Sequence, residues 1–505
     1  MPQQYLEILQ RVELYRTLYV TETGEDVATN RPPYNMSLPY KTLLAAKNAA
    51  RSGDTIVVAA GTYQMTESLL KNGVNWHFLP GATVVNDLTP LSKMEGSAVT
   101  QAIFDDLNTA IVSKITGSGT FLVLFGIQRW DDGEALPIDT NVNRYTFVRL
   151  RHASSDVTIE FERATYSGYS SGGRQMVYIE DCLQCTLRGR ALDRLNVAQT
   201  FDIAVPPAVN GPYFVPDSYG GIWWKKGETY IDIDVIVSGV YSLYPEGEGV
   251  ATPTNLWVRA NRIESLNGAT IYFNGAANPN YKLWVTAQEI IASGVATSGT
   301  TPNNVLHLQG IGKVYIDALK IGCVGGGSIG YASGHASGPM EVWISAQKFS
   351  CGDSNGLVAF KVGVAGSNTN IVYLTAQHIE ATLPIGSPAF FIETNGANST
   401  LYINGGVFKM STNYGGINHI AGKTVATGVR IECNATNDVD NIPVKIGGAG
   451  CILDGCTLLA PALADSIDGS GTVKIYGTTY ANKAKDAAVT VQAGLGTLVV
   501  DVNVT

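Results

Sequence analysis

A short phrase recurs along the middle of the chain and constrains the fold more than any other feature. It places an aromatic residue, an aliphatic residue, a polar residue and usually alanine in succession, as in Trp257-Val258-Arg259-Ala260. The seven copies begin at Tyr230, Trp257, Trp284, Tyr315, Trp343, Tyr373 and Tyr402. The phrase thus returns after an almost constant interval, and a regular period of this length is typical of solenoids.

The alternation within each phrase predicts a β-strand, because side chains on a strand change faces at every residue. Further short apolar strands, such as 270–273 and 305–308, lie between the copies. The intervals contain no helical pattern, so each strand is expected to stack on its own next copy. This predicts an all-β fold, a single-stranded parallel β-helix with about 28 residues per coil. Leucine-rich repeats and β-propellers have different spacings and fit poorly.

The aromatic and polar residues of each phrase are expected to point outward, over an interior of aliphatic residues and alanine. An outward aromatic stripe of this size rarely stays bare on a soluble monomer. Two interpretations remain open: another chain or a covering segment buries the stripe, or its rings form a platform for the apolar faces of sugars. The predicted ligand- or subunit-binding residues are Tyr230, Trp257, Trp284, Tyr315, Trp343 and Tyr373.

Carboxylates near the first phrases are the best candidates for catalysis. A glycosidase needs two carboxyl groups about 5–10 Å apart, and Asp232 and Asp234 share one strand face. Asp202 and Asp217 lie close by in the sequence. The alternative is a structural role, in which Asp232 forms a cross-coil ion pair with Arg259, worth about 0–1 kcal/mol if exposed. The sequence carries no motif that predicts a metal or a cofactor.

The spacing between phrases widens before Thr229, which predicts an inserted loop at about 193–226. A long loop that leaves a regular solenoid often carries function. Packing against its own coil or a sister subunit is the alternative. The candidate binding residues of this loop are Tyr213, Phe214, Trp223 and Trp224.

Charge and hydropathy exclude several classes of partner. The formal net charge is −9, which disfavours nucleic acid because phosphate binding needs a basic surface. No apolar run reaches the roughly 20 residues that span a bilayer, so we expect no membrane insertion. The first residues lack the pattern of a signal peptide, so we expect synthesis in a cytoplasm. The seven cysteines, including a lone CxxC at 182–185, are expected to be free thiols rather than a zinc site.

The segment at 18–125 carries a series of short motifs. They are Tyr19-Val20, Leu38-Pro39-Tyr40-Lys41-Thr42-Leu43, an alanine-rich helix at 45–50, Gly53-Asp54-Thr55-Ile56 and Gly61-Thr62-Tyr63. This series resembles the first segment of right-handed parallel β-helix proteins of the pectin-lyase-like superfamily. The resemblance implies that the helix caps the open end of the first coil, since an open β edge invites aggregation. That superfamily includes lyases, hydrolases, adhesins and viral spikes, so it implies a fold rather than a function.

Four regions are expected: a docking helix at 1–17, the cap and first coils at 18–125, a regular β-helix at 126–410, and a strand-rich region at 411–505. The last region resembles the ends of bacteriophage spike and fibre proteins. Together these resemblances imply a virion surface protein, a phage tailspike or receptor-binding tail fibre. It would be a homotrimer, attached to other virion tail proteins through 1–17, that binds a host surface polysaccharide or receptor.

Two alternatives remain open at this point. The first is a depolymerase, a polysaccharide lyase or glycoside hydrolase that uses the carboxylates near 202–234. The second is a structural tail or baseplate component without a ligand.

Overall fold

Stacked parallel β-strands build both compact units of the chain. In this computed structural model the first unit comprises Met1–Gly239 with Asn255–Arg259, and the second Val240–Thr254 with Ala260–Thr505. The structure describes residues 17–26, 38–65, 69–87, 104–105, 113–124, 148–151, 156–167, 174–180, 182–194, 219–238, 241–247, 254–265, 268–275, 279–293, 304–323, 328–335, 338–352, 359–363, 369–382, 389–410, 414–433, 441–460, 466–481, 490–492 and 497–499.

Three series of parallel pairings run through the first unit, one for each side of the coil. The first series is β1 (Thr17–Val20), β2 (Thr55–Val58), β4 (Asn75–Phe78), β7 (Ser113–Gly117), β10 (Asp156–Ser167), β12 (Cys182–Arg194) and β14 (Gly227–Ser238). The second is β3 (Gly61–Gln64), β5 (Ala82–Asp87) and β8 (Thr120–Leu124), which pairs with the end of β10. The third is β6 (Phe104–Asp105), β9 (Val148–Arg151), β11 (Arg174–Glu180) and β13 (Tyr219–Trp224).

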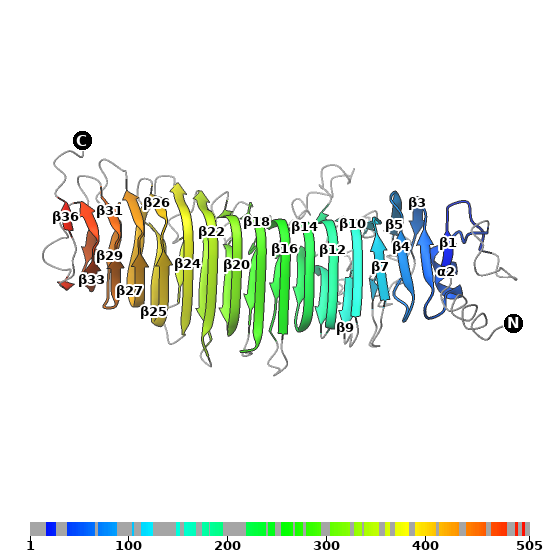
Figure 1. Cartoon of the computed structure of the whole chain (residues 1–505), viewed down its shortest axis with the longest axis horizontal. Helices are drawn as coiled ribbons and strands as arrows, with labels where there is room; N and C mark the ends of the chain where they lie inside the picture. The colour runs from blue at the N-terminus through cyan, green and yellow to red at the C-terminus, as the bar shows by residue number, and fades with distance from the viewer. Residues whose placement is uncertain are drawn as a thin grey trace, which may run out of the picture. The chain divides into compact units, whose positions relative to one another are not determined.

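The second unit repeats this arrangement, and its strands lie side by side from green to red in Figure 1. The first series is β18 (Tyr281–Ala292), β20 (Gly312–Cys323), β22 (Met340–Gly352), β24 (Asn370–Thr382), the ends of β25 (Ala389–Asn404) and β27 (Tyr414–Thr427), then β30 (Cys451–Asp454), β33 (Thr472–Tyr476) and β35 (Thr490–Gln492). β16 (Thr254–Ser265) is divided between the two units.

The other two sides of the coil in the second unit are made of shorter strands. One side is β26 (Val407–Met410), β28 (Arg430–Cys433), β31 (Thr457–Leu459), β34 (Thr479–Ala481) and β36 (Thr497–Val499). The other is β15 (Leu243–Pro245), β17 (Ile271–Asn274), β19 (Asn304–Gly310), β21 (Ser328–Gly334), β23 (Phe360–Val362), the starts of β25 and β27, β29 (Val444–Ile446) and β32 (Ile467–Gly469).

The predicted right-handed parallel β-helix is therefore confirmed. The strand-rich residues after position 410 continue the stacking with coils of uneven length. The step from Val425 to its partner Ile452 is about as long as those of the regular repeat, whereas two other steps are shorter. Tyr402 pairs with Val425, and Ile452 pairs with Lys474. Both steps are shorter than the step from Tyr373 to its partner Tyr402 in the preceding coil. The change in step length explains why the repeat is difficult to recognise in this part of the sequence.

The predicted capping helix is also present, as α2 (Leu43–Ala49). Its N-cap is Thr42, whose hydroxyl oxygen accepts a hydrogen bond from the backbone N–H of Ala45 at 3.2 Å. This bond satisfies one of the N–H groups that a helix start leaves unpaired. The buried face of the helix carries Leu43 and Ala46, and the helix contacts β1.

The inserted loop predicted at 193–226 is too long and needs correction. β12 extends to Arg194, and Tyr219–Trp224 forms β13, which pairs with β11. The run Ile222-Trp223-Trp224 has strand alternation, with Ile222 and Trp224 buried and Trp223 half-buried. The side chain of Trp224 packs inside its coil, where its Nε1 donates to Thr229 Oγ1 at 3.0 Å, so it is not a surface contact.

Several residues singled out in the sequence lie outside the described residues. They include the docking helix up to position 16 and the loop residues Asp202, Tyr213, Phe214 and Asp217.

The interior of the second unit is filled by the aliphatic and alanine positions of the phrase, as predicted. Ile316 and Ile344 are each 2 % exposed, and Ala318 and Ala346 are buried above one another in register. Such positions carry most of the stabilisation, because the burial of apolar area is the main favourable term in folding.

We expect Ile344→Ala to lower the free energy of unfolding by about 2–5 kcal/mol, since it leaves a cavity between two coils. The neighbouring exposed substitution Ser345→Ala should change it by less than about 0.5 kcal/mol. Urea unfolding followed by circular dichroism compares the two variants. Equal shifts would contradict the assignment of alternate residues to interior and surface.

Candidate binding groove

Five aromatic side chains form a stacked ladder along the second unit. Their rings come from β18, β20, β22, β24 and β25, whose strands pair in register. Successive ring centroids are 5.4, 4.6, 5.3 and 5.0 Å apart, and the ring planes differ by only 7–9°. This offset stacking is a favoured geometry for aromatic pairs. The aromatic ladder consists of Trp284, Tyr315, Trp343, Tyr373 and Tyr402.

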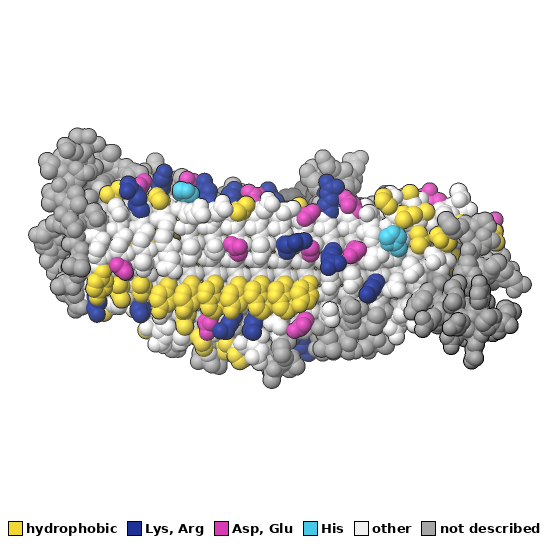
Figure 2. Space-filling view, viewed as in Figure 1, with side chains coloured by type: hydrophobic (Ala, Val, Ile, Leu, Met, Phe, Trp, Pro, Cys, Tyr) yellow, Lys and Arg dark blue, Asp and Glu magenta, His cyan; other side chains and the backbone are white. Residues whose placement is uncertain are grey.

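Stacking covers part of each ring, so the aromatic ladder is half-buried without any covering chain. Figure 2 shows hydrophobic side chains gathered in a row along this unit. Two lysines from neighbouring coils add to the cover. Lys313 Nζ lies 5.8 Å from the ring centroid of Trp343, and Lys423 Nζ lies 5.7 Å from that of Tyr402. Both distances are within the range of a cation–π contact.

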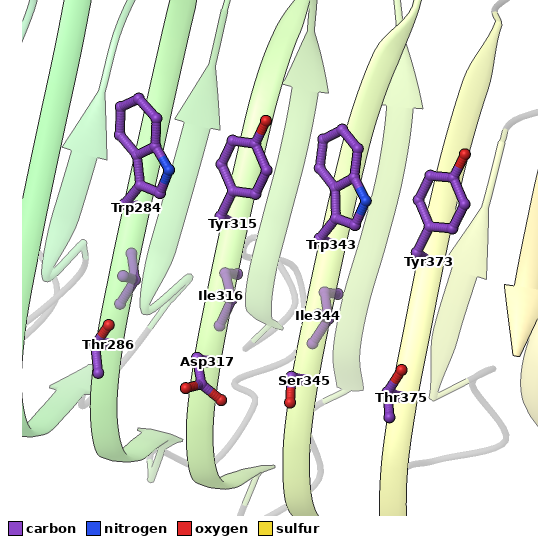
Figure 3. A pocket seen from close by; sticks show the side chains of 11 residues that line it. Trp284, Thr286, Tyr315, Ile316, Asp317, Trp343, Ile344, Ser345, Tyr373 and Thr375 are labelled. Carbon is purple, nitrogen blue, oxygen red and sulfur yellow. The ribbon is translucent and has the colours of Figure 1, made fainter. Parts of the chain in front are cut away.

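A shallow groove of about 320 Å³ runs beside the rings. Two positions after each aromatic residue, the same strand presents a small polar side chain on the same face (Figure 3). These side chains also stack in register and form the polar ladder. Inward-facing aliphatic residues such as Ile316 and Ile344 separate the two ladders at the floor of the groove. The polar ladder consists of Thr286, Asp317, Ser345 and Thr375.

The groove combines the two kinds of group that bind sugars. Aromatic rings suit the apolar faces of a pyranose, and the hydroxyl and carboxyl groups can exchange hydrogen bonds with its hydroxyls. The next outward position on three of these strands is glutamine, at Gln288, Gln347 and Gln377, and each of these side chains is exposed. Hydrogen-bonding groups therefore continue beyond the polar ladder.

The first unit contains a separate aromatic pair of the same kind. The rings of Tyr230 and Trp257 stack at 4.4 Å with planes 3° apart, and Tyr230 is 42 % exposed. Trp223, on β13, is half-buried, lies edge-on to the Tyr178 ring at 4.9 Å and is covered by Lys225 at 5.4 Å. The predicted contact residues Tyr230, Trp257 and Trp223 thus reach the surface of their unit.

The predicted ion pair between Asp232 and Arg259 is confirmed. Arg259 donates from Nε and from one terminal nitrogen to the two carboxylate oxygens of Asp232, at 2.8 and 2.6 Å. This hydrogen bonding raises the pKa of Arg259 above its ordinary value. Asp234 shares the outward face with Asp232, as expected. A carboxylate held in a two-point pair by arginine is poorly placed to act as a nucleophile or base.

A tyrosine–histidine cluster, which the sequence did not predict, lies on another side of the second unit. The ring of Tyr272 stacks on His307 at 4.0 Å, and His307 lies 4.3 Å from the ring of Tyr331. The hydroxyl of Tyr331 is hydrogen-bonded to His307 Nε2. Gln309 donates to the Tyr272 hydroxyl at 3.1 Å, and its Oε1 lies 3.2 Å from His307 Nε2. No constant residue type marks these positions, so the repeat does not reveal them.

The cluster is held in its uncharged form near neutral pH. Burial lowers the pKa of His307 to about 4, and it raises the pKa of Tyr331 to about 12. Burial also raises the pKa of Tyr272. The buried Nδ1 of His307 has no hydrogen-bond partner among the described residues. A neutral, hydrogen-bonded cluster suits packing or binding better than acid–base catalysis at neutral pH.

Cys323 and Cys351, which are 28 residues apart, stack in neighbouring coils. They pair in register and both side chains are buried, with the sulfur atoms 3.0 Å apart. The buried cysteines that the structure describes are Cys185, Cys323, Cys351, Cys433, Cys451 and Cys456.

Among the residues that the structure describes, no group of three or more His, Cys, Asp or Glu side chains could hold a metal ion. The same part of the chain contains no helix of the length and hydropathy needed to cross a bilayer.

The depressed pKa of His307 predicts a loss of stability in acid. The unfolded chain, with an ordinary pKa of 6.5, binds the proton more tightly, so stability falls as the pH drops from about 6.5 towards 4. His307 should contribute on the order of 1–3 kcal/mol to this loss in the free energy of unfolding. His307→Phe keeps a ring against Tyr272. In urea titrations, this variant should show a smaller difference in the free energy of unfolding between pH 7 and pH 4.5 than the wild type. The exposed His378→Phe is the control, and an unchanged slope in His307→Phe would contradict the assignment.

Comparisons with models of protein families, with curated proteins and with solved structures found no match to this chain.

Proposed function

We propose that this protein binds an extended surface polysaccharide along the groove between the aromatic ladder and the polar ladder. The observation that carries the proposal is the run of stacked rings beside in-register hydroxyl groups in one groove. Each coil advances about 4.8 Å, so the five rings extend over roughly 19 Å. A polymer of sugar rings aligned with the coils would meet an aromatic side chain and a polar side chain at every coil.

The ladder geometry supports a bound polymer more than a buried subunit contact. The rings already cover part of one another, so they leave less apolar area bare than separate side chains would. None of the five rings of the aromatic ladder is among the large exposed side chains of the chain. A half-buried aromatic wall beside hydrogen-bonding groups is the usual composition of a sugar site, whereas the core of a subunit interface has fewer polar groups.

The setting of this activity follows from the resemblance of 18–125 and 411–505 to β-helix and phage spike segments. We infer a virion surface protein, a tailspike or tail fibre of the pectin-lyase-like type, that attaches to a host cell by its glycan. The protein would be a homotrimer and would join other tail proteins through 1–17. Cleavage of the glycan, and a purely structural role, are the alternatives, and the ion pair of Asp232 with Arg259 gives no support to cleavage.

Removing one ring should weaken glycan binding without unfolding the protein. We expect Trp343→Ala to reduce retention on bacterial surface polysaccharide by at least about tenfold, because the ring stacks between Tyr315 and Tyr373. Tyr476→Ala removes an aromatic side chain that is 43 % exposed and lies outside the groove. This control should bind as the wild type does. Equal retention by both variants would refute the groove as the site.

The same variant separates a glycan site from a subunit contact. Light scattering on the purified full-length chain should give the mass of a trimer. Trp343→Ala should have the same mass but weaker retention on the polysaccharide. If Trp343→Ala dissociates the trimer, the aromatic ladder is a subunit contact instead. A monomeric wild type would exclude the trimer.

Incubation with the polysaccharide tests the depolymerase alternative. We expect the glycan to keep its length, and Asp232→Asn to leave binding unchanged. Shortened glycan chains that disappear with Asp232→Asn would replace the binding proposal with an enzymatic one.

A further inference from the structure

Four outward carboxylates on the strands of the second unit follow one rule: each is paired with a cation from a neighbouring coil. Glu289 lies near Arg262, Glu341 near Lys313, Glu380 near Lys348 and Glu393 near Lys361, at N–O distances between 2.6 and 3.2 Å. Such pairs follow from the stacking, because in-register coils place outward residues above one another. They leave little net charge along these rows.

Asp317 departs from this rule. It pairs in register with Thr286 on one side and Ser345 on the other, and neither can neutralise a carboxylate. Among the residues that the structure describes, no cation forms an ion pair with Asp317 and no group is hydrogen-bonded to its side chain. The side chain is exposed. A solvated carboxylate with no cation beside it is open to a positive group from outside.

Asp317 is also the charged residue of the groove. All other residues that line it are aromatic, aliphatic or hydroxyl-bearing. Figure 3 shows the carboxylate on the strand that carries the Tyr315 ring, in the row between the hydroxyls of Thr286 and Ser345. The nearby Lys313 lies two positions before Tyr315, whereas Asp317 lies two positions after it, and the ammonium of Lys313 donates to Glu341.

Two rings of the aromatic ladder already accept ammonium groups. Lys313 and Lys423 place their Nζ atoms over Trp343 and Tyr402. An aromatic face attracts a cation through its quadrupole, and the attraction adds to that of a nearby carboxylate. The groove therefore offers two groups that favour positive charge, and its lining contains no lysine or arginine that would favour an anion.

We propose that the groove recognises a polysaccharide that carries protonated amino groups, with one ammonium seated at Asp317 and sugar rings against Tyr315 and Trp343. This inference rests on the proposed glycan binding and names the class of glycan. Uronic-acid and sulfated polymers are disfavoured, because their negative groups would meet Asp317, and the ammonium of the nearby Lys313 is already paired with Glu341.

A matched pair of ligands tests the inference. The probes are the β-1,4-linked glucosamine hexamer and its fully N-acetylated counterpart, which differ in the charged amine. Tryptophan fluorescence measures binding, because Trp284 and Trp343 line the groove. The wild type should bind the amino hexamer about fivefold more tightly at low salt. This preference should fade as salt rises to about 0.5 M, where exposed charge pairs are screened.

Two variants that each remove one negative charge test whether Asp317 is responsible for the preference. Asp317→Asn should abolish the preference, so that the amino hexamer and the acetylated hexamer bind with similar affinities. Asp454→Asn is the matched control, because Asp454 is exposed on β30 and does not line the groove. Ser345→Asp, which adds a second carboxylate in the same row, should increase the preference.

The outcomes separate this inference from the proposal beneath it. Equal affinity of the wild type for both hexamers, or tighter binding of polygalacturonate, overturns the amine at Asp317 while glycan binding stands. If Asp317→Asn lowers the affinity for both hexamers equally, the inference is also overturned, since the carboxylate would then contribute to binding without regard to the charge of the glycan. If the wild type binds none of these glycans nor the bacterial polysaccharide, the proposed function fails as well.

Discussion

Parallel pairing in register is the constraint on which the other features of this protein depend. Backbone hydrogen bonds join each strand to the next coil, so every side chain lies above its counterpart about 4.8 Å away. A residue must therefore suit the residue one coil away as well as its own strand. This requirement stacks Tyr315 on Trp343 and Ala318 on Ala346. It also brings Arg259 to Asp232.

The sequence predicts those parts of the fold in which the repeat is regular and the residue types are constant. The aromatic ladder, the helix α2 and the pair of Asp232 with Arg259 follow from spacing or from a motif. The predictions fail where the step length changes. Coils after position 410 differ in length, as the step from Val425 to Ile452 and the shorter step from Ile452 to Lys474 show, and this hides the period. The widened spacing before Thr229 concealed β13, a strand of six residues whose start does not fall at the expected interval.

The candidate site was predicted only in part, for a physical reason. Ring positions follow from the alternation of one strand, so the aromatic residues could be named from the sequence. The electrostatic character of the groove depends on which side chains in adjacent coils reach each carboxylate. Asp317 and Glu341 are both acids on outward positions, yet the ammonium of Lys313 neutralises only Glu341. The tyrosine–histidine cluster likewise depends on contacts among three strands whose residue types differ.

A ladder of nearly equal rungs has a further consequence for any polymer that lies along it. A chain shifted by one coil would meet almost the same rings and hydroxyls, so many alignments have similar free energies. Such degeneracy favours capture, because an arriving chain can bind in several positions and then slide between them. The unpaired carboxylate of Asp317 breaks the equivalence at one rung. It would favour one alignment of a long, repetitive polymer over the alignments shifted by one or more coils.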